Sequence, residues 1–312
     1  MRPPIFAGML PAFLTVLFFA SSAVCATQSA RMLGGTEANF WRLAIATALL
    51  AVWAHTCGQG LEGRAFVIFV VSGVIGIGAD VFLFQTLPRI GSRLSLLIIQ
   101  CFSAISAAVL EWVWLGTKLT ATQAAACAII LAGVAVALAP GRHISATRPR
   151  LAAGIGFGLL AAFGNGFGAV LSRKAYAIAA LARLNIDGAT AAYQRLIGGL
   201  FVAAICLLVV KRREVVAQVT DAAPPRLPEM EKWRRAWPWV LANGFAGQTL
   251  GVTCYQWALK TTPTGLVLAI VATAPLVVIP FARLFELEPI APRSVFGGIV
   301  AVAGAILLIT AG

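Results

Sequence analysis

The sequence predicts an all-α polytopic membrane protein, with ten transmembrane helices arranged as two inverted five-helix repeats. The first observation behind this prediction is composition: 60% of the 312 residues are hydrophobic, 11% are charged, and the mean hydropathy is +0.90. A soluble domain carries about 25% charged residues, so an ordinary water-soluble enzyme is excluded. A disordered chain is also excluded, because disorder needs low hydrophobicity. The second and third observations are a succession of apolar runs and a match between the two halves of the chain.

Ten apolar runs, each about long enough to cross a bilayer, follow one another along the chain. The predicted spans are residues 6–26, 37–55, 65–87, 91–116, 120–140, 151–172, 188–210, 236–260, 264–284 and 290–311. The closest turns contain helix breakers or charges, at Pro88-Arg89, Gly116–Lys118, Thr261–Pro263 and Glu288-Pro289. Spans of about 20 residues use roughly 200 residues of the chain. No soluble catalytic domain therefore fits between them.

Two segments of the chain need a choice between interpretations. The N-terminus imitates a secretory signal, because Arg2 precedes an apolar run that is followed by small residues up to Cys25-Ala26. We expect the first helix to be retained, since the second half has a helix at the matching place. The connection from Lys211 to Arg235 is long and basic. We expect a solvated loop there, with or without a short helix at the headgroups, rather than a binding arm.

The charged, cysteine and histidine residues point to a membrane rather than to nucleic acid or a metal. The net charge is +13, but most Lys and Arg residues lie in gaps between apolar runs, where they set topology and contact anionic lipids. The six cysteines are scattered without metal-ligand spacing, and there are two histidines. No phosphate-binding GxxxxGK[ST] motif occurs. We therefore expect no cofactor, no metal and no nucleic-acid partner.

Polar positions in the two halves match at a fixed offset. The pairs 171 positions apart are Gln85 and Gln256, Arg89 and Lys260, and Ala132-Gly133 and Ala303-Gly304; Arg42-Leu43 and Arg195-Leu196 match at 153. The long connection of residues 211–235 accounts for the difference between these two offsets. The chain thus divides into repeats at residues 1–145 and 146–312. An odd number of spans per copy inverts the second copy, and inverted repeats that meet at a central site are a recurring design of secondary transporters.

With these features the chain resembles the EamA-type drug/metabolite transporters over nearly its whole length. The residues that carry the resemblance are Arg42, Arg195, the helix ends 85–89 and 256–260, Leu115–Thr120 with Gly133, and Leu284–Ile290 with Gly304. The resemblance implies ten spans in two repeats, with both termini in the cytoplasm. Basic residues are in excess on the odd-numbered connections. Because basic residues favour the cytoplasmic side of a membrane, this excess instead places both termini outside. One departure is Thr117, where the family commonly has Glu; the second copy keeps an acid, Glu288.

Asp80 is the strongest candidate for a functional residue, because it is the one acid deep within a predicted apolar span. Its helical face maps through the repeat onto Gln248, Gly251 and Tyr255. The functional interpretation is a carboxylate that binds substrate or a proton in a central cavity. The alternative is a structural Asp bonded to a neighbouring helix.

Other polar residues inside spans have both a functional and a packing interpretation. In the fourth span, Gln100, Ser103 and Glu111 share one stripe, and Glu111 beside Trp112 favours an interfacial position. Thr273 precedes Pro275, which could free a helix carbonyl toward a cavity. Small and hydroxylated residues also serve ordinary helix packing.

Three further residues complete the candidate set. Asn165 lies among alternate glycines, which permit either close packing or a break beside a cavity. Arg42 and Arg195 lie several residues inside their spans, where each could neutralise a substrate anion. An arginine that snorkels to the interface or binds loop carbonyls is favoured over that role.

The leading functional hypothesis is a secondary transporter, rather than an enzyme, in a plasma (bacterial inner) membrane. It would export small metabolites such as amino acids or related compounds by alternating access, and Asp80 would carry a proton. One alternative is export of lipophilic cations, although the first span, residues 6–26, lacks the acid that the small multidrug type uses. A membrane enzyme and a non-transporting membrane factor are less favoured, because no clustered acids and no signalling module are present.

Overall fold

The computed structural model describes residues 5–61, 63–139, 148–219, 229–278 and 292–310, and this part of the chain is helical without strands. The helices are α1 (Ile5–Leu33), α2 (Gly35–Thr56), α3 (Arg64–Gly76), α4 (Asp80–Leu115), α5 (Ala121–Leu138), α6 (Arg148–Leu181), α7 (Gly188–Val219), α8 (Glu229–Asn243), the π-helix η1 (Gly244–Gly251), α9 (Val252–Thr261), α10 (Thr264–Val271) and α12 (Pro292–Thr310).

Seven segments of the described residues are long and apolar enough to cross a membrane. They are Met9–Leu33, Arg64–Leu83, Leu94–Leu115, Ala121–Leu138, Arg148–Leu181, Gly188–Arg213 and Pro292–Thr310. Helix α10 belongs to a shorter apolar segment, Thr264–Val278, and α2 is not among the seven. The chain is therefore an integral multi-pass membrane protein, and the count of ten spans stays an expectation.

Local sequence explains several helix ends. Helix α4 ends at Leu115 because Gly116 adopts φ +70°, the left-handed conformation that favours glycine. Helix α5 then begins with a capping box, in which Thr120 and Gln123 each bond the other's backbone. The expected turn at Gly116–Lys118 is thus confirmed, as is the turn at Thr261–Pro263 between α9 and α10. The expected turn at Glu288-Pro289 lies outside the described residues.

Two sequence expectations are wrong. The break expected at Pro88-Arg89 lies earlier: the backbone turns at residues 77–79 and is then helical from Asp80 to Leu115. In the connection of residues 211–235, where a loop with at most a short helix was expected, the described residues are helical, since α7 extends to Val219 and α8 begins at Glu229. Contacts with α2 hold the extended end of α7 and the first turns of α8 in place. Lys211 forms an ion pair with Glu37 at 3.0 Å, and the Trp233 ring meets the Trp41 ring edge-on.

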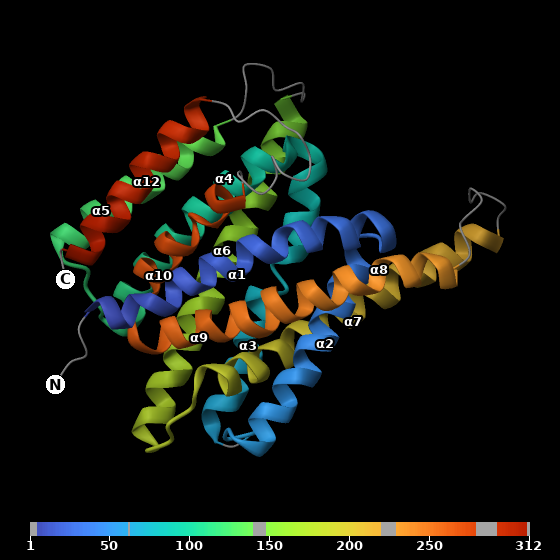
Figure 1. The fold of residues 1–312 in the computed structure, drawn as a ribbon, viewed down its shortest axis with the longest axis horizontal. Coiled ribbons are helices and arrows are strands. Elements are labelled where there is room, and N and C mark those ends of the chain that lie inside the picture. The colour runs from blue at the N-terminus through green and yellow to red at the C-terminus, as the bar shows by residue number, and fades with distance from the viewer. Residues whose placement is uncertain (1–4, 62, 140–147, 220–228, 279–291, 311–312) are drawn as a thin grey trace.

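The helices pack as a layered bundle (Figure 1). Helix α6 lies against α3 and α4, while α7 lies against α2 and α3. Helix α1 runs beside α8, η1 and α9, and both ends of the chain lie on the same side of the view in Figure 1. The bundle therefore brings segments from both sequence halves around one interior.

Helices α5 and α12 form a pair at one edge of the bundle (Figure 1). Small residues allow their backbones to touch: a Cβ on Gly133 would lie 2.4 Å from the Ala301 nitrogen, and one on Gly297 would lie 2.5 Å from the Ala137 nitrogen. Ser294 adds a hydrogen bond to the Ala137 carbonyl. This is the small-residue packing that holds membrane helices together without a hydrophobic driving force.

The outer surface of the bundle is apolar, and alanine is frequent in its interior. Val113, Leu208 and Ile299 expose 75%, 70% and 63% of their surface. A soluble protein rarely exposes such continuous apolar surface. These side chains therefore face lipid.

Candidate functional site

A cavity of about 400 Å³ lies in the centre of the bundle, bordered by α1, α2, α4, α6, α7, η1, α9 and α10. We name it the central cavity. Its polar lining is Ser22, Arg42, Asp80, Gln100, Ser103, Asn165, Arg195, Gln248 and Tyr255. Residues predicted from separate spans as candidates for substrate binding are thus brought together on one interior surface. Glu111 and Thr273 do not line it, and the functional role of every candidate stays a prediction.

Two helix interruptions border the central cavity at positions related by the repeat offset. In the first half the chain turns at residues 77–79, where Asp80 and Val81 donate their N–H groups to carbonyls three residues earlier, at 3.1 and 3.0 Å. In the second half, residues 248–250 lie within the π-helix η1. Ile77 and Gln248 both line the cavity. Corresponding interruptions in two halves of a transporter are a strong indication of its binding site.

Asp80 and Arg42 form a loose pair in the central cavity. The nearest oxygen and nitrogen of the two side chains are 3.8 Å apart, and the side chains expose 24% and 22% of their surface. That distance is too long for a hydrogen bond. Arg42 instead donates from Nε to Asn39 Oδ1 at 2.8 Å. Among the described residues, none donates a hydrogen bond to the Asp80 carboxylate, so both charged groups keep bonding capacity for a ligand.

Arg195 is held far more firmly than Arg42. Its Nη1 donates to Ser72 Oγ at 2.7 Å, to Ser172 Oγ at 2.9 Å and to the Gly168 carbonyl at 3.1 Å. Its guanidinium carbon lies 5.7 Å from the centre of the Tyr255 ring. The side chain is buried, so Arg195 does not extend to the interface; it binds a backbone carbonyl, although that of helix α6 rather than of a loop. Ser72 and Ser172 could not be identified from the sequence, because hydroxyl side chains are common in membrane helices.

The glycines around Asn165 serve close helix packing. A Cβ on Gly166 would lie 2.8 Å from the Ser103 carbonyl oxygen, and one on Gly168 would lie 2.7 Å from the Gly76 Cα. Helix α6 therefore touches the backbones of α3 and α4 on either side of Asn165. Asn165 lines the central cavity at this crossing.

Glu111 is not exposed on the surface, as a side chain that reaches interfacial water would be. Glu111 is 2% exposed, forms an ion pair with Arg173 and accepts the backbone N–H of Thr264. Arg173 also donates to the Leu259 and Thr262 carbonyls, at 2.9 and 2.7 Å. We name this set of contacts the Glu111–Arg173 clamp; it joins α4, α6, α9 and α10. Sequence reasoning missed Arg173 because the sixth span was expected to end one residue before it.

Thr273 lies beside a break in the helix but outside the central cavity. The chain turns at residues 272–273, ahead of Pro275, and the Thr273 hydroxyl donates to the Ile270 carbonyl at 2.7 Å. From this part of the chain, Leu268 and Val271 line the cavity instead.

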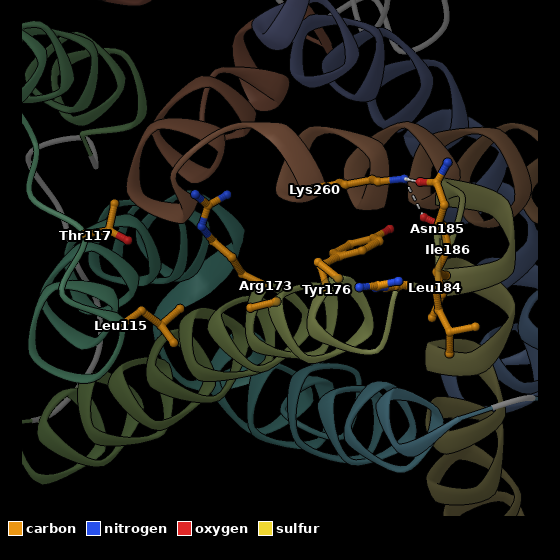
Figure 2. A pocket seen from close by; sticks show the side chains of 11 residues that line it. Leu115, Thr117, Arg173, Tyr176, Leu184, Asn185, Ile186 and Lys260 are labelled. Carbon is orange, nitrogen blue, oxygen red and sulfur yellow. Dashed lines mark hydrogen bonds between the residues drawn. The ribbon is translucent and has the colours of Figure 1, made fainter. Parts of the chain in front are cut away.

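A second cavity, of about 610 Å³, lies at the far ends of the helices that border the first (Figure 2). We name it the vestibule. Along α4, Ser103 lines the central cavity, Glu111 follows, and Leu115 lines the vestibule; along α6, the same order is Asn165, Arg173 and then Tyr176. The Glu111–Arg173 clamp thus lies at the end of the vestibule that is nearer the central cavity, and Arg173 itself lines the vestibule.

An apolar groove of about 340 Å³ meets the central cavity from the side. Residues of α2, α4 and α7 line it, and it shares Ile77 and Asp80 with the cavity. Its α7 wall is mainly aliphatic, with Val202, Ile205 and Val209 among its members. Asp80 therefore borders two spaces.

Comparison with known proteins gives a family and a fold. The sequence model of the EamA-like transporter family matches residues 6–139 and 152–310, so two matches cover nearly the whole chain. No curated protein matches the sequence. A solved structure, described simply as the crystal structure of a protein, is similar with a TM-score of 0.75 over 98% of this chain and 96% of its own. Its sequence is 15% identical, so the similarity shows the fold alone.

Proposed function

This chain belongs to the EamA-like transporter family, as its sequence motifs indicated, and from that premise we propose that it exports small metabolites such as amino acids. We propose ten transmembrane helices in two inverted repeats, residues 1–145 and 146–312. The protein would act as a secondary transporter in a plasma (bacterial inner) membrane. Its partners are a small-molecule substrate and the lipid bilayer.

One observation carries the proposal: the central cavity lies where both halves interrupt their helices. Departures from α-helical geometry at corresponding places in the two halves of a membrane protein point to a binding site. The same cavity holds Asp80 and Arg42 without a hydrogen bond between them, so groups of both signs are available. A substrate with an ammonium and a carboxylate group matches this arrangement.

Alternating access would move the helices around the central cavity. In the conformation described, the Glu111–Arg173 clamp joins α4 and α6 to the α9–α10 turn at the end of the vestibule that is nearer the central cavity. Release of this clamp would connect the cavity to the vestibule. Rocking of one part of a transporter against another commonly opens such a path.

Asp80 is the proposed site of proton coupling. A proton on its carboxylate would cancel the charge that faces Arg42 at 3.8 Å. Substrate and proton could then occupy the site in turn, because each changes the charge available to the other. The gradient of protons would drive export of the substrate.

The test is flux into and out of proteoliposomes that contain the purified full-length protein. Radiolabelled L-amino acids are assayed one at a time, with and without a pH gradient, beside protein-free liposomes. We expect saturable flux of at least one amino acid and faster accumulation with the gradient. Absence of carrier-dependent flux for every compound would refute the proposal.

A second candidate function is export of lipophilic cations. The apolar groove favours it, because an aliphatic wall leads from the lipid side of α7 to the Asp80 carboxylate. Tetraphenylphosphonium in the same flux assay separates the candidates: a cation exporter transports it, whereas an amino-acid exporter does not.

A further inference from the structure

The vestibule is lined by positive charge. Arg173, Arg183 and Lys260 belong to its wall, and no acidic side chain is among the described residues that line it. The central cavity differs, since its two arginines face Asp80. Thr117 is the neutral residue that the α4–α5 turn contributes to the vestibule.

Two of the three cations in the vestibule lack an ion-pair partner in the described part of the chain. Arg173 is paired with Glu111. The Lys260 ammonium is held by two neutral oxygens, Asn185 Oδ1 at 2.6 Å and the Ile186 carbonyl at 2.7 Å (Figure 2). Arg183 is exposed and makes no ion pair with any described residue.

The nearby acid Asp187 forms no ion pair with the described residues of this wall, although its charge acts on Lys260 at longer range. Its carboxylate accepts the N–H groups of Ala189 and Thr190, at 2.8 and 2.9 Å, and the Thr190 hydroxyl. These bonds cap the N-terminus of α7. Asp187 is therefore already bonded, and it does not line the vestibule.

Tyr176 adds an unused hydrogen-bonding group to the same wall. It is 7% exposed, and its hydroxyl has no hydrogen-bond partner among the described residues. In Figure 2 the ring lies between Arg173 and Asn185, below Lys260. A buried hydroxyl without a partner is uncommon, and an acceptor oxygen on a ligand would satisfy it.

From these contacts we infer that the vestibule binds the carboxylate of the transported substrate. This inference rests on the proposed transport function and narrows its substrate class to carboxylate-bearing metabolites, against lipophilic cations. Guanidinium and ammonium groups bind carboxylates through charge-assisted hydrogen bonds, whereas they repel a cation. A substrate that leaves the vestibule for the central cavity meets Arg42 and Arg195 there, so a positively charged partner for its carboxylate is present at both ends of the path.

The phosphate of an anionic lipid shares this chemistry, so the test must separate the two sources. The full-length protein is placed in phosphatidylcholine nanodiscs, and binding of L-alanine, L-leucine and L-phenylalanine is measured by calorimetry. Each amino acid is compared with its amide, which lacks the carboxylate, and with tetraphenylphosphonium. Thermal melts of the protein are also recorded, with and without added phosphatidylglycerol.

Two variants alter the vestibule without touching the clamp. Arg183→Gln removes a cation that has no ion pair, and Thr117→Glu adds an acid to the wall. Arg64→Gln is the matched control, because Arg64 is an exposed cation at the start of α3 and does not line the vestibule. Loss of one charged hydrogen bond should weaken binding about tenfold. We expect that loss for Arg183→Gln, a loss for Thr117→Glu as well because its added carboxylate repels that of the ligand, no change for the control, and no binding of the amides.

Several results would overturn the inference. One is failure of every amino acid to bind at millimolar concentration; another is equal binding by Arg183→Gln and the unmodified protein. A third is a variant effect confined to the stabilisation by phosphatidylglycerol, which would identify a lipid-headgroup site. Failure of the transport proposal looks different: carboxylate binding would retain its dependence on Arg183, while proteoliposomes would show no flux.

Discussion

Replacement of Glu111 by Gln should destabilise the bundle substantially, because it leaves a positive charge without its counterion. Glu111 is 2% exposed, and its carboxylate bonds both Arg173 and the Thr264 N–H. Removal of one member of a buried pair typically costs 3–5 kcal/mol. Two features reduce that figure here. The Arg173 side chain is 21% exposed and keeps its bonds to two carbonyls, and Gln can still accept from Thr264. We therefore expect a loss of about 2–3 kcal/mol.

A double-mutant cycle measures the pair itself. The free energy of unfolding is obtained by denaturant titration in mixed micelles for Glu111→Gln, Arg173→Gln and the double variant. Residues in contact should show a coupling energy of about 1–3 kcal/mol, so the double variant should be less destabilised than the sum of the single variants. Trp112→Phe serves as a control, since this neighbour is exposed to lipid. A Glu111→Gln loss below about 1 kcal/mol with additive variants would refute the clamp.

Three further predictions address the site, the packing and a helix cap. Asp80→Asn should leave the protein folded and its substrate exchange intact but abolish acceleration by a pH gradient; flux at two pH values checks this, and unchanged gradient-driven flux would show that the acid is structural. Gly168→Ala should lower the free energy of unfolding by about 1–3 kcal/mol, because the added Cβ would lie 2.7 Å from the backbone of α3. Gly156→Ala should cost nothing, because the space around Gly156 is open, and thermal melts compare the two variants. For Asp187, burial alone would raise the pKa, but the hydrogen bonds that the carboxylate accepts at the start of α7 lower the pKa below 3.8. The contribution of Asp187 to folding stability is therefore present above pH 3.8 and is lost as the pH falls through the lowered pKa. Asp187→Ala should cost about 1 kcal/mol at pH 7 and much less at acid pH; equal losses at both pH values would contradict the cap.

The sequence by itself determined the environment of this protein and its family. Apolar runs far exceed what a soluble chain carries, and burial in lipid is the physical consequence. The short turns at Gly116 and Pro263 were predictable, because backbone conformation there depends on the residue itself. The helical face of Asp80 and the matching face with Gln248, Gly251 and Tyr255 also followed from spacing, since helical periodicity and the repeat offset are properties of the chain.

Only the tertiary structure decided which polar groups are committed and which are available. Arg42 and Arg195 look alike in the sequence, yet Arg195 is held by Ser72 and Ser172 while Arg42 is 3.8 Å from Asp80. Glu111 was expected at the interface because it neighbours tryptophans, but its side chain points from α4 toward α6 and α10. The physical reason is that a charge inside a membrane is tolerated where another helix supplies its partner, and the partner is fixed by packing rather than by sequence neighbours.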